Sequence, residues 1–369
     1  MIAPLIIERL AVRGFRNLQP LDMEPGPRFN IIHGENGAGK SNLLEAIHLL
    51  GRLGSFRGAK TDDLLMDGEE RAVLKMRIRG PLTSSVIAME LIRGKSRKVA
   101  LDGKRPRRLS VVRERAPMVI FHPAHLSLAS GSAELRREYM NDLLVRIAPG
   151  YQEALESYEK ALRSRNRLLR DETLRRDALV PYERLMARHG AVLIEERARL
   201  TELISGKIEA VFAEVVGEGV RIDVRYEPRV DGGEEELLKC YQEALPKDRS
   251  RGFTADGPQS DELAIRLASN QSTGSARSHG SQGQHRSIAL AMKMVELDLL
   301  GQELGKIPVL LLDDVSSELD RTRNRRLFEK LSHLGGQVFL TTTHPEFILL
   351  EENRREFEID RGRIVGVSG

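Results

Sequence analysis

Tryptophan is missing from the sequence, and cysteine occurs only once in 369 residues, at Cys240. A single cysteine excludes an internal disulfide and a cysteine-based metal cluster. No apolar run approaches the ~20 residues of a membrane-spanning helix. The first residues, MIAPLIIERL, also lack the basic start and the length of a signal peptide. We therefore expect a cytoplasmic protein that has no membrane partner.

The composition is typical of a globular protein with about two domains, on a prior of ~150 residues for each. Apolar residues make up 40% and charged residues 30% of the sequence. The 58 basic and 54 acidic residues give a formal net charge of +4. An excess this small is compatible with binding to nucleic acid but does not predict it.

The most informative stretch is HGENGAGKS, residues 33–41. An apolar run of strand type, FNII, precedes it, and NLLEAIHLLG follows it with apolar residues at helical spacing. Strand, glycine-rich turn and helix form the context that a phosphate-binding loop requires. The glycines let backbone N–H groups point inward, and the helix adds its positive N-terminal end. We predict that a nucleotide is bound by Gly34, Glu35, Asn36, Gly37, Ala38, Gly39, Lys40, Ser41 and Asn42.

Side chains in and around this loop have predicted roles. Lys40 is expected to reach the β and γ phosphates, and the hydroxyl of Ser41 to ligate Mg²⁺. Upstream, a strand, the turn RGFRN and a second strand place Arg16 and Asn17 one strand away from the loop. These two residues are candidates to approach the base or ribose, and a plain solvated turn is the alternative. Downstream, SFR at residues 55–57 is expected on the nucleotide side.

A basic cluster follows in stretches of alternating polarity that predict an antiparallel sheet. The dipeptide Asp102-Gly103 predicts a two-residue hairpin turn within it. The cluster is a candidate to track a DNA backbone. Basic residues also protect exposed sheet edges from pairing, so that alternative stays open. The cluster consists of Arg93, Lys95, Arg97, Lys98, Lys104, Arg105, Arg107 and Arg108.

From about residue 131 the sequence becomes rich in Glu, Arg, Leu and Ala, with apolar residues three and four apart. This pattern predicts three or four helices, interrupted at Pro149-Gly150 and Pro181. We predict a mainly helical inserted lobe over 131–247. Residues 1–130 together with 248–369 would then form an α/β head that holds the nucleotide.

A second motif, Ser281-Gln282-Gly283-Gln284, opens a long predicted helix. It offers a hydroxyl, free N–H groups and a helix dipole to an anion. Taken alone, this motif is a weak indication of a binding site.

A third motif is the apolar strand VLLL, which ends in Asp313 and Asp314. A buried strand delivers these carboxylates to the sheet edge where the phosphate loop also lies. We predict that Asp313 holds Mg²⁺ through water and that Asp314 orients or deprotonates the attacking water. A later strand, QVFLTTTH, ends at His344, which is a candidate to bond the γ-phosphate.

The order of these motifs resembles that of the ATP-binding-cassette ATPases. Within that superfamily the chain resembles the RecF family of bacterial DNA replication and repair ATPases. The resemblance rests on RGFRN, GENGAGKSNLLEAIHLL, SFR, HGSQGQHR and LLLDDVSSELD, and it runs from residue 1 to about residue 345. It implies an ABC-type ATPase head with a mixed sheet. The helical insertion would be a short counterpart of the long arms of SMC proteins.

The resemblance also implies an ATP-dependent homodimer that acts on DNA. Lys40, Ser41 and Asp313 would bind Mg·ATP in one subunit, while Ser281 and Gly283 would reach it from the other. Ser317 and Asp320 would belong to a loop at the dimer interface. DNA gaps or stalled forks, as duplex or duplex/single-strand junctions, and proteins of the RecO and RecR kind are the implied partners.

The sequence departs from the family pattern in two places. Pro123-Ala124-His125-Leu126 stands where a Pro-Glu-Asp-Leu segment is usual, and Gln259-Ser260 stands where His-Arg is usual. Two other functions remain open: an adaptor that dimerises on ATP without hydrolysing it, and the nucleotide-binding subunit of a transporter. The RGFRN motif and the helical insertion argue against the transporter subunit.

Overall fold

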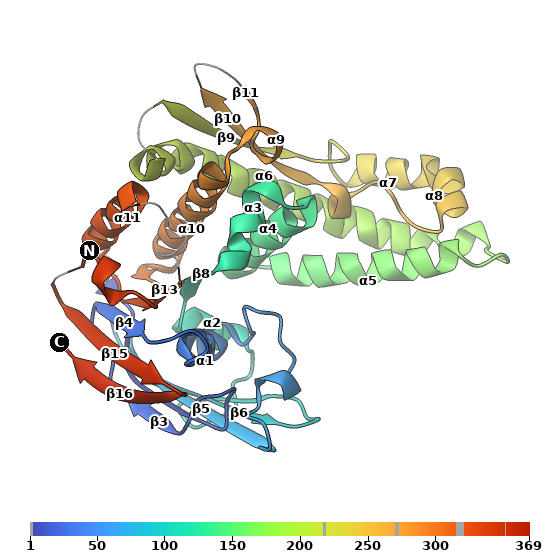
Figure 1. Cartoon of the computed structure of the whole chain (residues 1–369). Helices are drawn as coiled ribbons and strands as arrows, with labels where there is room; N and C mark the ends of the chain where they lie inside the picture. The colour runs from blue at the N-terminus through green and yellow to red at the C-terminus, as the bar shows by residue number, and fades with distance from the viewer. Residues whose placement is uncertain (1–2, 217–218, 270–272, 315–320, 351) are drawn as a thin grey trace. The chain divides into compact units, whose positions relative to one another are not determined.

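The computed structural model describes residues 3–216, 219–269, 273–314, 321–350 and 352–369 (Figure 1). Contacts divide the chain into two compact units. The first unit comprises Met1–Leu126, Glu214–Val216 and Arg286–Gly369. The second unit comprises Ser127–Ala213 and Gly217–His285.

The first unit contains a six-stranded mixed sheet in the order β16-β15-β4-β14-β13-β8. All neighbouring strands are parallel except β15 and β16, which form an antiparallel hairpin. Parallel strands bring their carboxyl ends to one edge, where ligands of α/β sheets usually bind. The strands are β4 (Phe29–His33), β8 (Met118–Phe121), β13 (Val309–Asp313), β14 (Val338–Thr342), β15 (Arg354–Asp360) and β16 (Arg363–Ser368).

A second sheet of this unit is antiparallel, in the order β3-β2-β5-β6-β7. Its central strands alternate buried and exposed residues, as expected for a sheet with one face on the core. The strands are β2 (Ile6–Arg13), β3 (Leu21–Met23), β5 (Arg71–Arg79), β6 (Ser84–Ile92) and β7 (Lys98–Leu101). The predicted antiparallel sheet is therefore present, and Asp102 and Gly103 adopt positive φ of 53° and 77° in the predicted turn.

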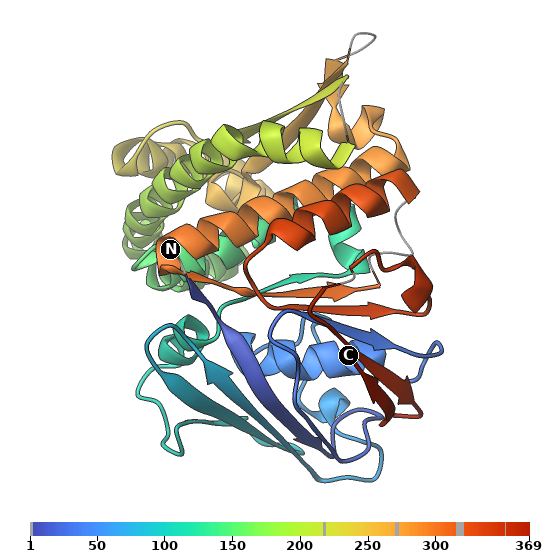
Figure 2. The same ribbon diagram turned by 90° about the vertical axis from the view of Figure 1, so that its left-hand side faces the viewer.

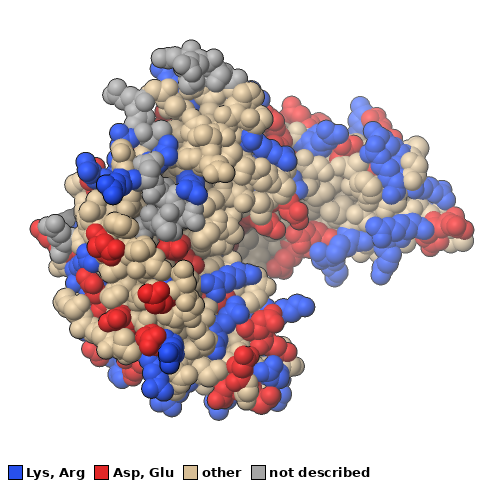
Figure 3. All heavy atoms as spheres, viewed as in Figure 1, with Lys and Arg blue, Asp and Glu red and all other residues tan. Residues whose placement is uncertain are grey.

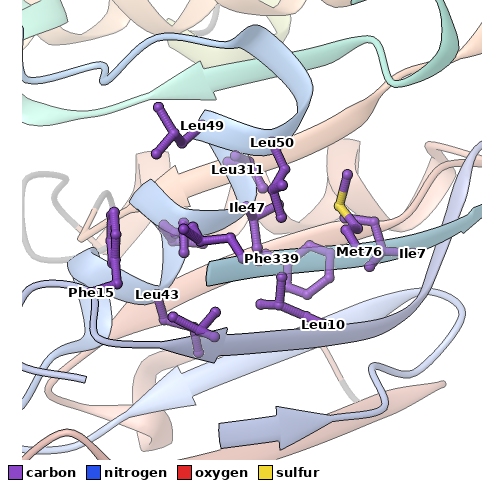
Figure 4. Packing of buried hydrophobic residues seen from close by; sticks show 14 of the residues in the cluster. Ile7, Leu10, Phe15, Leu43, Ile47, Leu49, Leu50, Met76, Leu311 and Phe339 are labelled. Atoms are coloured by element: carbon purple, nitrogen blue, oxygen red, sulfur yellow. The ribbon is translucent and has the colours of Figure 1, made fainter. Parts of the chain in front are cut away.

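Helix α1 (Lys40–Arg52) lies between the two sheets and supplies much of the core. Figure 4 shows Leu43, Ile47 and Leu50 packed against side chains from both sheets, among them Leu10 and Phe339. Figure 2 shows α10 and α11 side by side across the opposite face of the six-stranded sheet. The helices of this unit are α1, α2 (Ser110–Arg115), most of α10 (Gln282–Leu304) and α11 (Arg321–His333), with short turns η1 (Asp62–Leu64), η2 (Pro123–Leu126) and η6 (Pro345–Phe347).

One buried amide joins the two sheets. Gln337 precedes β14 and is completely buried. Its Oε1 accepts the N–H of Ile7 in β2 at 2.7 Å, and its Nε2 donates to the carbonyls of Ile7 at 3.0 Å and Gly26 at 2.7 Å. A short two-stranded sheet of β1 (Ala3–Pro4) and β12 (Lys306–Ile307) adds a further link.

The second unit consists of helices and a three-stranded antiparallel sheet in the order β11-β10-β9. Three or four helices are predicted after residue 131, and three long ones are present: α4 (Ala133–Ile147), α5 (Tyr151–Leu169) and α6 (Val180–Val216). The other elements are α3 (Ser127–Ser130), η3 (Arg176–Ala178), β9 (Val220–Glu227), α7 (Glu234–Glu243), α8 (Leu245–Arg251), η4 (Pro258–Ser260), β10 (Glu262–Ser269), β11 (Thr273–Ser275) and α9 (Ala276–His279).

The boundaries of the inserted lobe differ from the proposed range 131–247. The second unit begins at Ser127 and continues to His285. The reason is that β10 pairs with β9 over its whole length, from Glu262 opposite Glu227 to Ser269 opposite Val220. Residues 248–285 therefore lie with the inserted lobe rather than with the head. Within the described ranges, no helix is both long and apolar enough to cross a bilayer.

Candidate nucleotide-binding site

The predicted phosphate loop connects β4 to α1, with strand and helix placed as the sequence indicates. Gly34 has a φ of 149°, and a Cβ at this position would lie 2.1 Å from the carbonyl oxygen of Ile359. Only glycine allows the loop to approach β15 this closely. Gly39 has a φ of 114° and precedes the first turn of α1. The first N–H groups of the helix therefore face the loop without intrahelical partners.

Lys40 lies inside this loop. Its ammonium donates to the carbonyls of Gly34 at 2.7 Å and Glu35 at 2.9 Å. Burial lowers the pKa of Lys40, and the carboxylates of Asp314 and Asp313 oppose that shift. A buried ammonium at the N-terminal end of a helix suits the phosphates of a nucleotide, and the two carboxylates suit an accompanying Mg²⁺.

The loop is braced from outside by three backbone or amide contacts. Asn17 Nδ2 donates to the carbonyl of Gly37 at 3.0 Å, and Asn42 Nδ2 donates to Asn17 Oδ1 at 2.8 Å. The N–H of Gly362 donates to the carbonyl of Ala38 at 2.8 Å. Asn17 therefore contacts the phosphate loop directly. It is not part of a turn that only lies near the loop.

Asp313 and Asp314 stand at the end of β13, at the same sheet edge as the loop. Thr341 of β14 fixes both: its hydroxyl donates to Asp313 Oδ1 at 2.8 Å and accepts the N–H of Asp314 at 2.9 Å. Asp314 has a φ of 52°, in the left-handed region that few residues other than glycine, asparagine and aspartate adopt. The strained backbone turns the second acid away from the strand direction.

A buried carboxylate, Glu45, organises the side of the site that the sequence did not reveal. It is completely buried in α1 and accepts from Arg16 Nε at 2.9 Å and from Ser55 Oγ at 2.5 Å. Arg57 lies 3.6 Å from Glu45, donates to Asn42 Oδ1 at 2.7 Å and lies 3.9 Å from Asp313 Oδ2. The sequence feature that could have identified Glu45 is a glutamate inside the apolar helical run NLLEAIHLL.

This cluster gives Arg16 and Arg57 different positions. Arg16 is held by Glu45 and by the carbonyl of Asp63 at 2.8 Å, so its guanidinium has a partner other than a base or ribose. Arg57 bridges the loop side chain Asn42 and the acid Asp313, and 37% of its side chain is exposed. The SFR segment thus lies beside the predicted phosphate loop and Asp313.

His344 follows β14, and its N–H donates to Thr342 Oγ1 at 3.0 Å. Its ring lies 3.1 Å from Glu346 Oε1, and 58% of its side chain is exposed. Ser41, the second residue of α1, and buried Asp313 present hydroxyl and carboxylate oxygens at one sheet edge. Such hard oxygen ligands suit Mg²⁺, which keeps most of its remaining ligands as water and phosphate.

The predicted signature belongs to the second unit, at the start of α10. Ser281 Oγ accepts the N–H of Gln284 at 3.2 Å, and Gln284 Oε1 accepts the N–H of Ser281 at 2.8 Å. These reciprocal bonds form a capping box. They explain why serine and glutamine occur three residues apart here, with Gln282 and Gly283 between them. Ser281 is exposed.

The remaining predicted positions fall into three groups. Ser317 and Asp320 lie outside the described residues. His125, at the first departure, stacks near His122 with ring centroids 4.0 Å apart, and burial lowers its pKa well below the ordinary value. Gln259, at the second departure, accepts from the hydroxyl of Tyr158 inside the second unit, and Ser260 Oγ donates to the carbonyl of Ala255 at 2.7 Å.

The basic cluster divides into paired and exposed members. Arg93 pairs with Glu70 at 3.1 Å, Lys98 pairs with Glu90 at 3.1 Å, and Arg97 donates to the carbonyl of Leu53 at 3.0 Å. On the face of the first unit that Figure 3 shows, basic side chains lie among acidic ones. The exposed members without an ion pair among the described residues are Lys95, Lys104, Arg105, Arg107 and Arg108.

A phosphate loop before α1, two acids after β13 and a helical insertion define an SMC-like, ABC-type ATPase head. The sequence profile of the RecF/RecN/SMC N-terminal domain matches residues 6–359. The DNA replication and repair protein RecF of Citrifermentans bemidjiense is 34% identical over 369 residues, which cover 97% of this chain and 99% of that protein. RecF of Anaeromyxobacter sp. (strain Fw109-5) is 36% identical over 348 residues, 92% of each chain.

A solved structure agrees with these sequence matches. The structure of the recombination mediator protein RecF-ATPrS in the RecFOR pathway superposes with a TM-score of 0.88 at 29% identity, over 98% of both chains. The chain belongs to the RecF family of DNA replication and repair proteins. This confirms the family that the motifs indicated.

Proposed function

We propose that this protein is an ATP-gated DNA clamp of the cytoplasm: two copies close on shared Mg·ATP at gaps or stalled forks and hydrolyse it slowly. The observation that carries the proposal is the arrangement of Lys40 inside the loop, facing the acids that Thr341 fixes. The similar solved structure is that of a RecF-ATPrS complex, which supports nucleotide binding at this site. Family membership makes a transporter subunit the weaker alternative.

The residues have distinct roles in this proposal. Lys40 and the N–H groups of α1 bind the β and γ phosphates, while Ser41 and Asp313 hold Mg²⁺. Mg²⁺, when bound, neutralises charge that develops on the phosphates. Asp314 orients the attacking water, and His344 bonds the γ-phosphate. Arg57 joins this set because it already bridges Asn42 and Asp313.

Dimer closure depends on the signature at the start of α10. Ser281 of one copy caps the γ-phosphate held by Lys40 of the other, so that ATP becomes part of a symmetric interface. Ser317 and Asp320 line that interface in the same proposal. Loss of the γ-phosphate removes a contact that both copies share, so hydrolysis loosens the dimer.

Sedimentation with and without ATP tests this closure. Wild type should dimerise with ATP, whereas Lys40→Met and Ser281→Arg should remain monomeric. Ser278→Arg is a matched control, since Ser278 is also an exposed serine near the start of α10. If Lys40→Met and Ser281→Arg both dimerise with ATP as wild type does, the shared-ATP interface is wrong.

DNA and repair proteins are the proposed partners. The exposed members of the basic cluster, such as Lys104 and Arg107, would contact DNA phosphates. Proteins of the RecO and RecR kind would then take over the DNA gap or stalled fork. Binding to duplex and to duplex/single-strand junctions should weaken steeply with salt. The double variant Lys104→Glu and Arg107→Glu should reduce the dependence of DNA affinity on salt concentration. If that dependence is unchanged, the basic cluster serves only to protect the sheet edge from pairing.

The adaptor function remains the second candidate, because Asp314 is the sole proposed base and an aspartate carboxylate is a weak base. Phosphate release with and without duplex DNA separates the two functions. Release that DNA stimulates supports the clamp. No release under either condition supports an adaptor that uses ATP only to dimerise.

A further inference from the structure

A groove on the first unit contains none of the predicted nucleotide-binding residues. It has a volume of about 850 Å³ and is lined by β3 and by the β15–β16 hairpin. Figure 1 shows these strands at the lower left. Its lining mixes charged residues with apolar ones, among which Met23 and Phe357 are buried and Ile364 is partly buried.

Two arginines that line this groove have N–H donors available for a ligand. Arg355 Nε is buried and has no hydrogen-bond partner among the described residues, and its guanidinium lies 5.8 Å from the centre of the Phe357 ring. Buried donors of this kind are rare and call for a ligand or water. Arg363 is exposed and makes no ion pair within the described chain. Arg9, by contrast, is neutralised by Asp22 at 2.5 Å, and Glu24 is the remaining acid.

The groove is bordered by two open strand edges. Among the described strands, β3 pairs only with β2, and β16 pairs only with β15. Open edges present unpaired N–H and C=O groups, and proteins usually protect them with charge. The edge strand β16 instead exposes Val365 and Val367, at 57% and 54% of their surface. An extended peptide that adds to such an edge gains main-chain hydrogen bonds and side-chain pockets.

We propose that this groove binds an extended segment of a partner protein in which acidic and apolar residues alternate, added as a strand to β16. Alternation follows from strand geometry, because successive side chains point to opposite faces. Acidic side chains would pair with Arg355 and Arg363 through charge-assisted hydrogen bonds. Apolar side chains would cover the exposed Val367.

The groove suits a peptide better than a nucleic acid. Its lining carries both signs of charge, with Asp22 and Glu24 beside the arginines, whereas a phosphate backbone is best matched by a uniformly basic surface. The open edge of β16 offers main-chain N–H and C=O groups with which an extended peptide can form a ladder of hydrogen bonds.

Fluorescence anisotropy of the full chain with a labelled eight-residue peptide of alternating glutamate and valine tests the proposal. The peptide should bind wild type, and its lysine-for-glutamate counterpart should bind at least tenfold more weakly. Methylating alternate backbone amides on one edge of the peptide should abolish binding, whereas methylating those on the other edge should leave it intact. Failure of the glutamate peptide to bind wild type overturns the proposal.

Variants locate the site. Arg355→Glu and, independently, the exposed Arg363→Glu should each weaken the glutamate peptide at least tenfold. Arg77→Glu is the matched control, because Arg77 is exposed on β5 and does not line the groove. Equal binding to wild type and to both groove variants overturns the site. So does loss of duplex DNA binding in both variants while peptide binding is unchanged, since the groove would then serve nucleic acid.

Discussion

Each of the two units contains a cluster of buried charge, and the two clusters differ in how they are closed. In the second unit, Arg165 is completely buried and bonds Asp248 at 2.7 Å, Thr254 Oγ1 at 2.6 Å and Glu183 at 3.3 Å. In the first unit, Glu45 is just as buried, but its partner Arg57 keeps 37% of its side chain exposed.

The difference separates scaffold from site. Arg165 joins α5, α6 and α8, and all its partners lie inside the unit. Arg57 donates a hydrogen bond to Asn42 and lies 3.9 Å from Asp313 Oδ2, at a partly exposed position where a ligand can replace protein partners. Closed networks fix a structure, whereas an open one can exchange partners during a reaction.

The largest effect should come from breaking the closed cluster. Arg165→Met leaves Glu183 and Asp248 buried without their cation, which should reduce the free energy of unfolding by about 4 kcal/mol. Chemical denaturation followed by circular dichroism measures this loss. Arg163→Met, two residues away on the same helix and 70% exposed, should stay close to wild type. If both variants lose a similar free energy of unfolding, the buried network of Arg165 contributes no more to stability than an exposed arginine does.

A smaller effect should appear when the pH falls. The pKa of His122 is lowered from 6.5 to about 4, first by burial and then by Lys293 and Arg57. The unfolded chain therefore takes up this proton before the folded one does, so stability is complete above pH 6.5 and declines toward pH 4. The loss is at most about 3 kcal/mol.

Denaturation at pH 7 and pH 4.5 of wild type and His122→Asn measures the contribution of this histidine. The variant should lose less stability on acidification than wild type does. Identical losses in the two proteins would contradict the assignment. Arg57 contributes to the lowered pKa of His122, so Arg57→Ala should raise that pKa. The size of the rise indicates how close the Arg57 guanidinium lies to His122.

An intermediate effect on the open cluster is expected from Glu45→Gln. This change leaves Arg16 and Arg57 without their shared carboxylate and should cost about 2 kcal/mol of stability. Its thermal unfolding should be compared with that of Glu70→Gln, whose side chain is 78% exposed. A variant as stable as wild type would mean that the two arginines find other partners without loss.

The smallest effect on stability should come from Arg57→Ala, below about 1 kcal/mol, because the guanidinium is partly exposed. Its effect on chemistry should be larger: phosphate release from ATP should fall about tenfold or more if this cation reaches the phosphates. If Arg57→Ala loses stability but keeps its activity, the cluster of Glu45 and Arg57 has a structural role rather than a functional one.

Much of the head and of the inserted lobe could be predicted from sequence because the signals are local. The phosphate loop, the acids after β13 and the helices α4 to α6 each depend on residues close together in the chain. Glu45 could not be assigned, since its partners Arg16 and Ser55 lie 29 and 10 residues away. Its role requires the tertiary structure that brings these segments together.

Two other features escaped prediction for the same reason. The second boundary of the inserted lobe depends on β10 pairing with β9, a contact between strands more than thirty residues apart, and composition carries no trace of it. The β15–β16 hairpin lies beyond the last motif, yet Gly362 in its turn contacts the phosphate loop. A Cβ on Gly362 would lie 2.0 Å from the carbonyl oxygen of Asn17, so the glycine has a packing reason.

The buried amide of Gln337 has a consequence for how the first unit opens. Because one side chain holds both the N–H and the C=O of Ile7, detaching one sheet from the other breaks two buried hydrogen bonds at once. Local fraying should therefore stop at this point. The amide proton of Ile7 should exchange with solvent only when the whole unit unfolds, at a rate set by global stability.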